Sequence, residues 1–282
     1  MISSQLDEFS RAICQTYNVE DPSTFWTCRP HFTRLLASGF LADLLSIQLG
    51  YCVSGQGEIV QAGSGSSARI VLPSGAQLDI LLVDPTVLDD KLFSYPSHGM
   101  MGFAAGADHA ELVLERYRHV EPYRNDVFDR QAALVRQPDQ VLRAMELAEV
   151  TAGWEAFRIR SVTRPIPLVL LQSKPALEFA WQYDPGTLLP LQAICPGSSA
   201  YRLFYATKLL GEVSGPRNTE ALLRISRHKS HFVRWAALQA LFAVDLDAAR
   251  ERLAGAVEDP HPRVREAAQS ALTRLARVRR AS

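Results

Sequence analysis

The stretch Leu92–His119, "LFSYPSHGMMGFAAGADHAELVLERYRH", determines how the middle of this chain is interpreted. It places three of the chain's seven histidines within 22 residues. Apolar side chains occupy every second position at Ala110, Leu112 and Leu114, as they do in a strand with one buried face. The pattern supports two hypotheses. Either the histidines hold a metal ion, or they lie on the solvated face of a sheet.

Short strand candidates surround this stretch within residues 54–198. Ala68–Val83 indicates two strands around a turn, and the other candidates are Gly102–Ala105, Ala110–His119, Val141–Val150, Trp154–Val162, Leu168–Ser173 and Leu177–Tyr183. Their close spacing, with turn residues between them, favours an antiparallel sandwich or barrel over parallel βαβ units. Ser54–Ala68 is rich in Gly and Ser and is expected to be a loop, and Val120–Pro138 a long polar connection.

Residues 1–53 precede this region and have a helical pattern. Gln5–Tyr17 carries apolar side chains at helical spacing, and a second apolar face starts after Pro30, which suits a first helical turn. Gly39 is expected to weaken or split this second helix.

Residues 199–282 are also helical and contain an internal repeat. "VRWAALQAL" begins at Val233, and "VREAAQSAL" begins 31 residues later at Val264. Two agreeing copies predict stacked helical hairpins, in which alanines permit close approach and Val and Leu fill the contact. The pattern resembles HEAT and HEAT-like repeats, which implies binding of protein or nucleic acid, or packing on another domain.

The strand count and order of residues 54–198 resemble the cupin family, a double-stranded β-helix. The resemblance implies a cage of three histidines and a carboxylate around iron or another divalent metal. His98 matches the second histidine of the His-x-His motif, but Pro96 takes the place of the first. Arg158 stands where the later histidine belongs, and a guanidinium cannot ligate a metal. The resemblance therefore predicts a cage that is broken or rebuilt.

A rebuilt metal site is one interpretation of the histidine-rich stretch. His109 and Glu111 alternate along one strand candidate, so they are expected to share a face. With His98 on a neighbouring strand, these three side chains are the predicted ligands. The competing interpretation leaves the polar face solvated and His98 in a turn.

A second interpretation uses arginine. Arg158 and Arg160 share one face of a strand candidate, and Tyr117 lies on another strand candidate. Guanidinium groups inside a barrel bind carboxylate or phosphate in bidentate fashion. These three residues are the predicted ligand-binding set, and surface charge is the competing explanation.

Charge is divided unevenly along the chain. Residues 1–215 carry 17 Lys and Arg against 23 Asp and Glu, and residues 216–282 carry 13 against 7. The balance of +6 in the repeat region indicates an acidic partner, with ordinary surface arginines as the alternative. Nucleic acid is not expected, because aromatic side chains do not interleave with the basic ones.

The composition indicates a reduced, cytoplasmic protein that does not enter a membrane. No apolar run approaches the ~20 residues that span a bilayer, and the N-terminus lacks the pattern of a secretory signal. The four cysteines are scattered without a Cys-x-x-Cys pair, which favours free thiols.

These observations predict an α+β chain with three parts: a helical segment at 1–53, a cupin-like antiparallel β-barrel at 54–198, and HEAT-like hairpins at 199–282. The resemblance implies a divergent cupin-type enzyme, similar to non-haem metal oxygenases, that acts on a small molecule or peptide. The alternative is a metal-free cupin-like binding or scaffold protein whose basic repeats dock an acidic protein partner.

Overall fold

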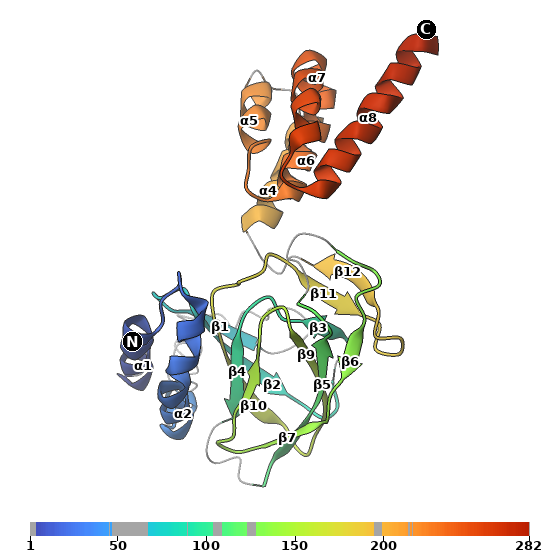
Figure 1. Cartoon of the computed structure of the whole chain (residues 1–282). Coiled ribbons are helices and arrows are strands. Elements are labelled where there is room, and N and C mark those ends of the chain that lie inside the picture. Colours follow the sequence, from blue (N-terminus) through green and yellow to red (C-terminus); the bar gives the residue numbers. More distant parts are fainter. Residues whose placement is uncertain are drawn as a thin grey trace. The chain divides into compact units, whose positions relative to one another are not determined.

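The structure is a computed structural model that describes residues 4–44, 46, 67–88, 90–103, 109–122, 128–194, 199–213, 215 and 217–281. It divides the chain into two compact units, Met1–Ile194 and Cys195–Ser282 (Figure 1). Among the described residues, none of the helices combines the length and apolar character that crossing a bilayer requires.

The first unit begins with helices α1 (Ser4–Thr16), η1 (Pro22–Cys28) and α2 (Arg29–Ala37). Gly39 has φ +71°, a left-handed conformation that suits glycine, and it separates α2 from the helical turn that follows. This confirms that the glycine splits the second predicted helix. Leu45 and Leu49, at the end of the predicted apolar face, lie outside the described residues, as does most of the predicted loop Ser54–Ala68.

Two antiparallel sheets follow and curl into a half-barrel. The five-stranded sheet has the order β1 (Ser67–Val71), β2 (Gln77–Val83), β10 (Ile166–Gln172), β4 (Gly99–Phe103) and β8 (Ala148–Val150). The seven-stranded sheet has the order β12 (Pro190–Ile194), β11 (Ala180–Tyr183), β3 (Leu92–Ser94), β9 (Glu155–Val162), β5 (Glu111–His119) and β6 (Leu134–Arg136), and β7 (Gln140–Arg143) also pairs with β5. The predicted α+β class and antiparallel barrel are confirmed.

Several strand boundaries differ from the prediction. Strands β3, β6 and β12 were not predicted, because these short segments show no periodic pattern of their own. β6 lies inside the segment that was predicted to be a polar connection. The single strand predicted for Val141–Val150 is two strands, since a turn with Met145 at φ +68° separates β7 from β8.

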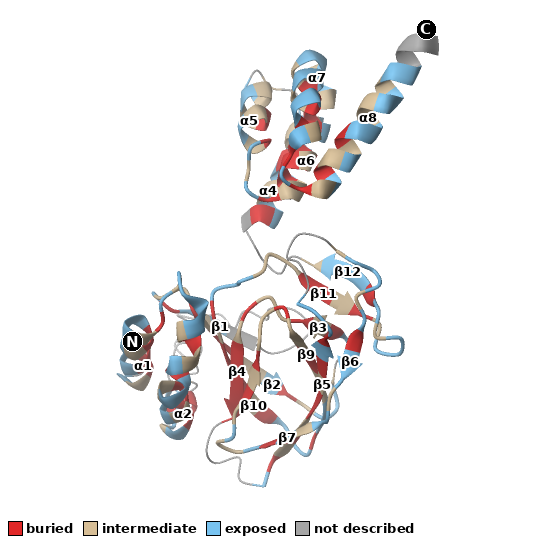
Figure 2. Ribbon diagram, viewed as in Figure 1, coloured by how far each residue is buried: buried red, intermediate tan, exposed pale blue. Residues whose placement is uncertain are grey.

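Apolar cores lie on both faces of each sheet. Helices α1, η1 and α2 pack on one face of the five-stranded sheet, where Phe9, Phe25 and Phe32 join Leu78 and Leu171 in one core. A second core fills the space between the two sheets, and a third covers the opposite face of the seven-stranded sheet. Figure 2 shows buried positions along strands of both sheets. Polar side chains that these cores cover must be satisfied within the protein.

The second unit consists of helices α4 (Ser199–Glu212), α5 (Asn218–Ile225), α6 (His231–Val244), α7 (Leu246–Gly255), the short η2 (Ala256–Glu258) and α8 (Pro262–Ala281). The repeat begins on α6 and recurs on α8, in agreement with the predicted hairpins. Small residues permit close helix contact, because a Cβ at Gly211 on α4 would lie 3.0 Å from the Cβ of Ala240 on α6.

Two of the four cysteines fall within the described residues. Cys14 is an exposed free thiol and Cys28 a buried one. Cys52 and Cys195 lie outside the described residues.

A methyl group at Gly102 tests the close packing of α2 on β4. A Cβ there would lie 2.8 Å from Leu36 Cδ1 and 2.9 Å from the carbonyl oxygen of Glu146, and that backbone cannot move cheaply. We expect Gly102→Ala to lower the free energy of unfolding by about 1–3 kcal/mol, measured by chemical denaturation with tryptophan fluorescence.

Gly99→Ala, on the same strand, is the matched control. Its added Cβ meets nothing closer than Leu170 Cδ1 at 3.4 Å, an ordinary contact. If the two variants lose equal stability, the contact of Gly102 with α2 is not the cause.

Candidate functional site

His98 lies immediately before β4, packed against helix η1. Its ring centroid is 6.3 Å from that of Phe25 and 5.3 Å from that of Trp26. Its Nδ1 accepts a hydrogen bond from the backbone N–H of Ala152 at 3.3 Å. Burial lowers the pKa of this imidazole, which favours the neutral ring. These contacts give His98 a packing role on the helix-covered side of the five-stranded sheet.

The other two predicted metal ligands lie in different surroundings. His109 is exposed in the turn before β5, with φ +72°, so it does not share a strand face with Glu111. Glu111 forms an ion pair with Arg143 on β7 at 3.0 Å. Nowhere in the described part of the chain do three His, Cys, Asp or Glu side chains converge as metal ligands must. The described structure does not bring His98, His109 and Glu111 together as a ligand set, and the metal site and its cofactor remain predictions.

Strand β5 buries side chains on both of its faces, which corrects the expectation of a solvated polar face. Leu112 and Leu114 enter the core between the sheets. Glu115, Tyr117 and His119, on the other face, are only 3–4% exposed. Loop residues near Phe128 and Leu177 cover that face, which the alternation pattern alone does not reveal.

The three predicted ligand-binding residues lie around the buried carboxylate of Glu115. Arg158, opposite it on β9, donates through Nε to Oε2 of Glu115. The Tyr117 hydroxyl donates to the same oxygen at 2.8 Å. Arg160 is further out, with Nη1 2.8 Å from Oδ2 of Asp139 and Nε 4.0 Å from Glu115 Oε1.

This arginine cluster is neutralised mainly by the chain's own carboxylates. Arg136 on β6 completes it, with Nη2 3.1 Å from Asp139 Oδ1 and 3.4 Å from Glu115 Oε1. The hydrogen bond from Arg158 holds the pKa of the Glu115 carboxyl below its usual range, against the opposing effect of burial. Glu115 is thus an ionised internal partner for the guanidinium groups that were predicted to bind an external anion.

Two further polar groups were missed by sequence reasoning. Asp79 on β2 accepts two hydrogen bonds from Arg69, at 2.6 and 2.8 Å, and one from Gln172 on β10. Arg116 on β5 donates to Glu155 at 2.7 Å and to Gln140 at 2.6 Å. The Arg69–Asp79 pair joins neighbouring strands, β1 and β2, whereas the contacts of Gln172 and Arg116 join residues that are 24 to 93 positions apart and that no local pattern indicates.

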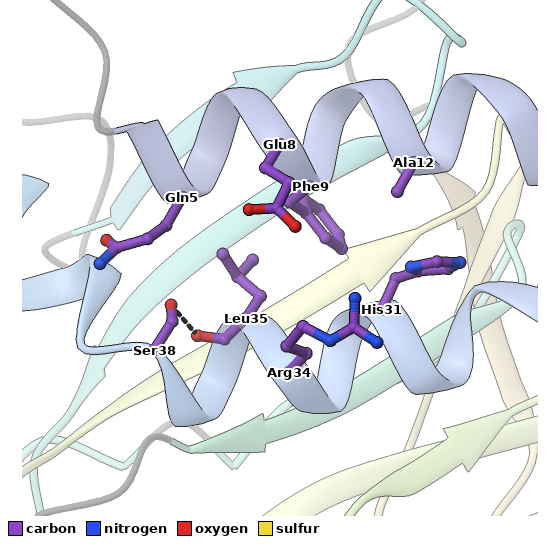
Figure 3. A pocket seen from close by; sticks show the side chains of 8 residues that line it. All are labelled: Gln5, Glu8, Phe9, Ala12, His31, Arg34, Leu35 and Ser38. Carbon is purple, nitrogen blue, oxygen red and sulfur yellow. Dashed lines mark hydrogen bonds between the residues drawn. The ribbon is translucent and has the colours of Figure 1, made fainter.

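A small hollow lies between α1 and α2. Glu8 of α1 points toward the side of the gap where Arg34 and His31 extend from α2, above an apolar floor that includes Phe9 and Leu35 (Figure 3). Its volume is about 60 Å³. Ligand pockets usually enclose roughly 300–1,000 Å³, so this hollow is too small to hold a substrate.

A larger open hollow lies in the second unit, between the turn that precedes α6 and the turn that precedes α8. Its volume is about 440 Å³, and we call it the basic hollow. Four basic side chains and two carboxylates line it together with three other residues: Arg227, His228, Lys229, Arg234, Arg252, Gly255, Glu258, Asp259 and Pro260. The excess of positive charge makes it suited to an anionic ligand.

Some cations of the basic hollow are structural and others are open. Arg234 and Asp259 are buried and form a bidentate pair at 2.8 and 2.5 Å. Arg252 donates to both oxygens of Ser226, at 2.9 and 2.8 Å. Arg227 and Lys229 are exposed, and neither takes part in an ion pair among the described residues. Sequence analysis did not predict this site, and the signal that could have indicated it is the basic run at 227–229 just before a repeat helix.

Comparison with known proteins gives one family match. The family model of HEAT repeats matches residues 191–273. No curated protein matches the chain in sequence.

Solved structures give partial likenesses at low identity. A Neisseria meningitidis protein is 14% identical with a TM-score of 0.25, over 44% of this chain and 95% of that one. The cupin domain of Drosophila melanogaster CENP-C is 14% identical with a TM-score of 0.25, over 47% and 98%. Lactobacillus farciminis oxalate decarboxylase is 11% identical with a TM-score of 0.28, over 63% of this chain and 39% of that one. Function must therefore be argued from the side chains of the sites.

His119 makes the stability of the first unit depend on pH. Its ring contacts Trp181, its Nε2 lies 3.2 Å from the Tyr183 hydroxyl, and burial lowers its pKa to about 4 from 6.5. Between pH 6.5 and 4, His119 is protonated in the unfolded chain but stays neutral in the folded chain. The contribution of His119 to the free energy of unfolding is therefore fully present above pH 6.5. It is lost as the pH falls toward 4, by about 3 kcal/mol in total.

The change His119→Gln keeps a hydrogen-bonding side chain beside Tyr183 but removes the titration. We expect the unfolding free energy of this variant to vary less between pH 6.5 and 4 than that of the native chain. Denaturant titrations at several pH values measure the difference, which separates His119 from His98, whose pKa is also lowered. Parallel pH profiles for the two proteins would contradict the assignment.

Proposed function

We propose that this chain is a metal-free binding or scaffold protein whose HEAT unit docks an acidic segment of a protein partner. The observation that carries the proposal is the basic hollow, in which Arg227 and Lys229 are exposed beside the anchored Arg252. The cupin-like unit serves as a structural body, since Arg158 and Arg160 are occupied by Glu115 and Asp139.

An acidic peptide suits the basic hollow better than a nucleic acid does. The lining includes the exposed carboxylate of Glu258, which repels a closely spaced phosphate backbone but can accept hydrogen bonds from peptide N–H groups. The large aromatic side chains of Phe, Tyr and Trp, on which nucleic acid bases stack best, are absent from the described lining. The site therefore favours a few carboxylates on a flexible chain.

Neutralising the open cations of the hollow should weaken binding of an acidic probe. We expect the double variant Arg227→Gln, Lys229→Gln to bind a fluorescein-labelled oligoglutamate peptide about tenfold more weakly, as measured by fluorescence anisotropy, because two partly screened charges are lost. Binding by the native chain should weaken as salt is added.

The matched control neutralises two exposed arginines of α8, Arg274→Gln and Arg277→Gln, which lie outside the hollow. It should change the affinity by less than about twofold. Equal losses in the two double variants would reduce the effect to net charge and contradict the proposal. Tighter binding of a single-stranded DNA oligonucleotide than of the peptide would replace the acidic partner with nucleic acid.

Metal content separates this proposal from the metalloenzyme hypothesis. The imidazole of His98 is packed beside Phe25 and Trp26, and Glu111 is paired with Arg143. We therefore expect far less than one equivalent of metal in untagged protein after anaerobic Fe(II) loading, by elemental analysis. One equivalent of metal that is lost in His98→Ala would contradict the proposal and favour the cupin-type enzyme.

A further inference from the structure

The two copies of the repeat hold their arginines in the same way. Arg234 and Arg265 occupy equivalent positions, 31 residues apart on α6 and α8. In each copy Nη1 donates to two carbonyl oxygens of the preceding turn: Arg234 to His228 and Lys229, at 2.9 and 2.7 Å, and Arg265 to Asp259 and Pro260, at 2.7 and 2.9 Å. Both guanidinium groups are therefore held by their own turns in the same orientation.

The other edge of each guanidinium differs between the copies. Nε and Nη2 of Arg234 form a two-pronged pair with Asp259, which belongs to the turn of the next copy. Nε and Nη2 of Arg265 have no acceptor among the residues that the structure describes, and this side chain is half-buried. The Nε–Nη2 edge of Arg265 is thus open, whereas the equivalent edge of Arg234 is paired with the carboxylate of Asp259.

The pair of Arg234 and Asp259 has no counterpart one repeat length earlier in the chain. The position 31 residues before Arg234 is Leu203, and the position 31 residues before Asp259 is His228. One repeat length earlier in the chain, on α4 and in the turn before α6, both members of the pair are therefore absent. A second copy of this chain stacked head to tail would present His228, and not a carboxylate, to Arg265.

We propose that the Nε–Nη2 edge of Arg265 is a preformed docking point for an aspartate or glutamate of a protein partner, received as Arg234 receives Asp259. A guanidinium edge matches a carboxylate in shape and charge, and the two carbonyl contacts of Nη1 have already restricted its motion. The N-terminal end of α8 adds a favourable dipole for an anion (Figure 1). The proposal rests on the proposed function, because it supplies the chemistry of one contact with the acidic partner.

The test uses the full-length chain and a fluorescein-labelled synthetic peptide of its own residues 245–275, which spans one repeat and includes Asp259. We expect Arg265→Gln to weaken binding of this peptide at least about tenfold. Arg265→Lys should weaken it nearly as much, since a lysine keeps the charge but not the two-pronged geometry. The control Arg274→Gln, an exposed arginine on the same helix, should change the affinity less than about twofold.

A change in the peptide tests the same contact with the native protein, so that misfolding of a protein variant cannot explain a loss of affinity. The peptide with Asp259→Asn should bind the native chain about as weakly as the unchanged peptide binds Arg265→Gln, and the two changes together should add little. Failure of the unchanged peptide to bind, or equal binding of the Asp and Asn peptides, would overturn the proposal.

The oligoglutamate experiment keeps the two proposals separate. If oligoglutamate binding depends on Arg227 and Lys229 but Arg265→Gln leaves the affinity for the repeat peptide unchanged, the docking point is wrong. The proposal for the basic hollow is then retained. If binding of the repeat peptide requires Arg265 while the Arg227→Gln, Lys229→Gln variant binds oligoglutamate as tightly as the native chain, the proposed role of the basic hollow is wrong. The Arg265 docking point is then retained.

Discussion

The buried carboxylate of Glu115 is the constraint on which the seven-stranded sheet depends. It lies on β5 with cores on both faces of the sheet, so its charge has to be neutralised by the protein itself. Arg158 on β9 supplies that charge, and the Tyr117 hydroxyl supplies a second hydrogen bond. The pairing of β5 with β9 therefore links polar contacts to strand register, and a slip of one residue would place Glu115 on the wrong face.

Arginines take opposite roles in the two units, and the number of open donors on each guanidinium decides which. In the first unit Arg158 and Arg160 meet Glu115 and Asp139, so an external anion would have to compete with carboxylates already in place. In the second unit the buried Arg234 joins successive repeats, whereas Arg265 keeps one edge open. The same residue type thus stabilises both units, and in the second unit Arg265 also keeps the open edge on which the proposed docking depends.

Much of the fold was predictable, because it rests on local patterns. The 31-residue repeat predicted the helical hairpins, and alternation or apolar runs located β5, β9 and β10. Strands β3, β6 and β12 were missed, since these short segments are held by neighbouring strands rather than marked by their own pattern. For the candidate site, Arg158 and Tyr117 do lie together, but their shared partner Glu115 looked like a solvated residue of an alternating strand.

The sequence by itself determined the α+β class, the antiparallel barrel and the repeat, since periodicity and turn chemistry act over short distances along the chain. Only the tertiary structure decided what covers each face and which charges meet. His98 packs against Phe25 rather than beside the other predicted metal ligands. The carboxylate of Glu115 pairs with the predicted arginine Arg158 inside the protein. Both outcomes depend on contacts between distant segments, and a buried polar group takes whichever partner the fold brings within hydrogen-bond distance.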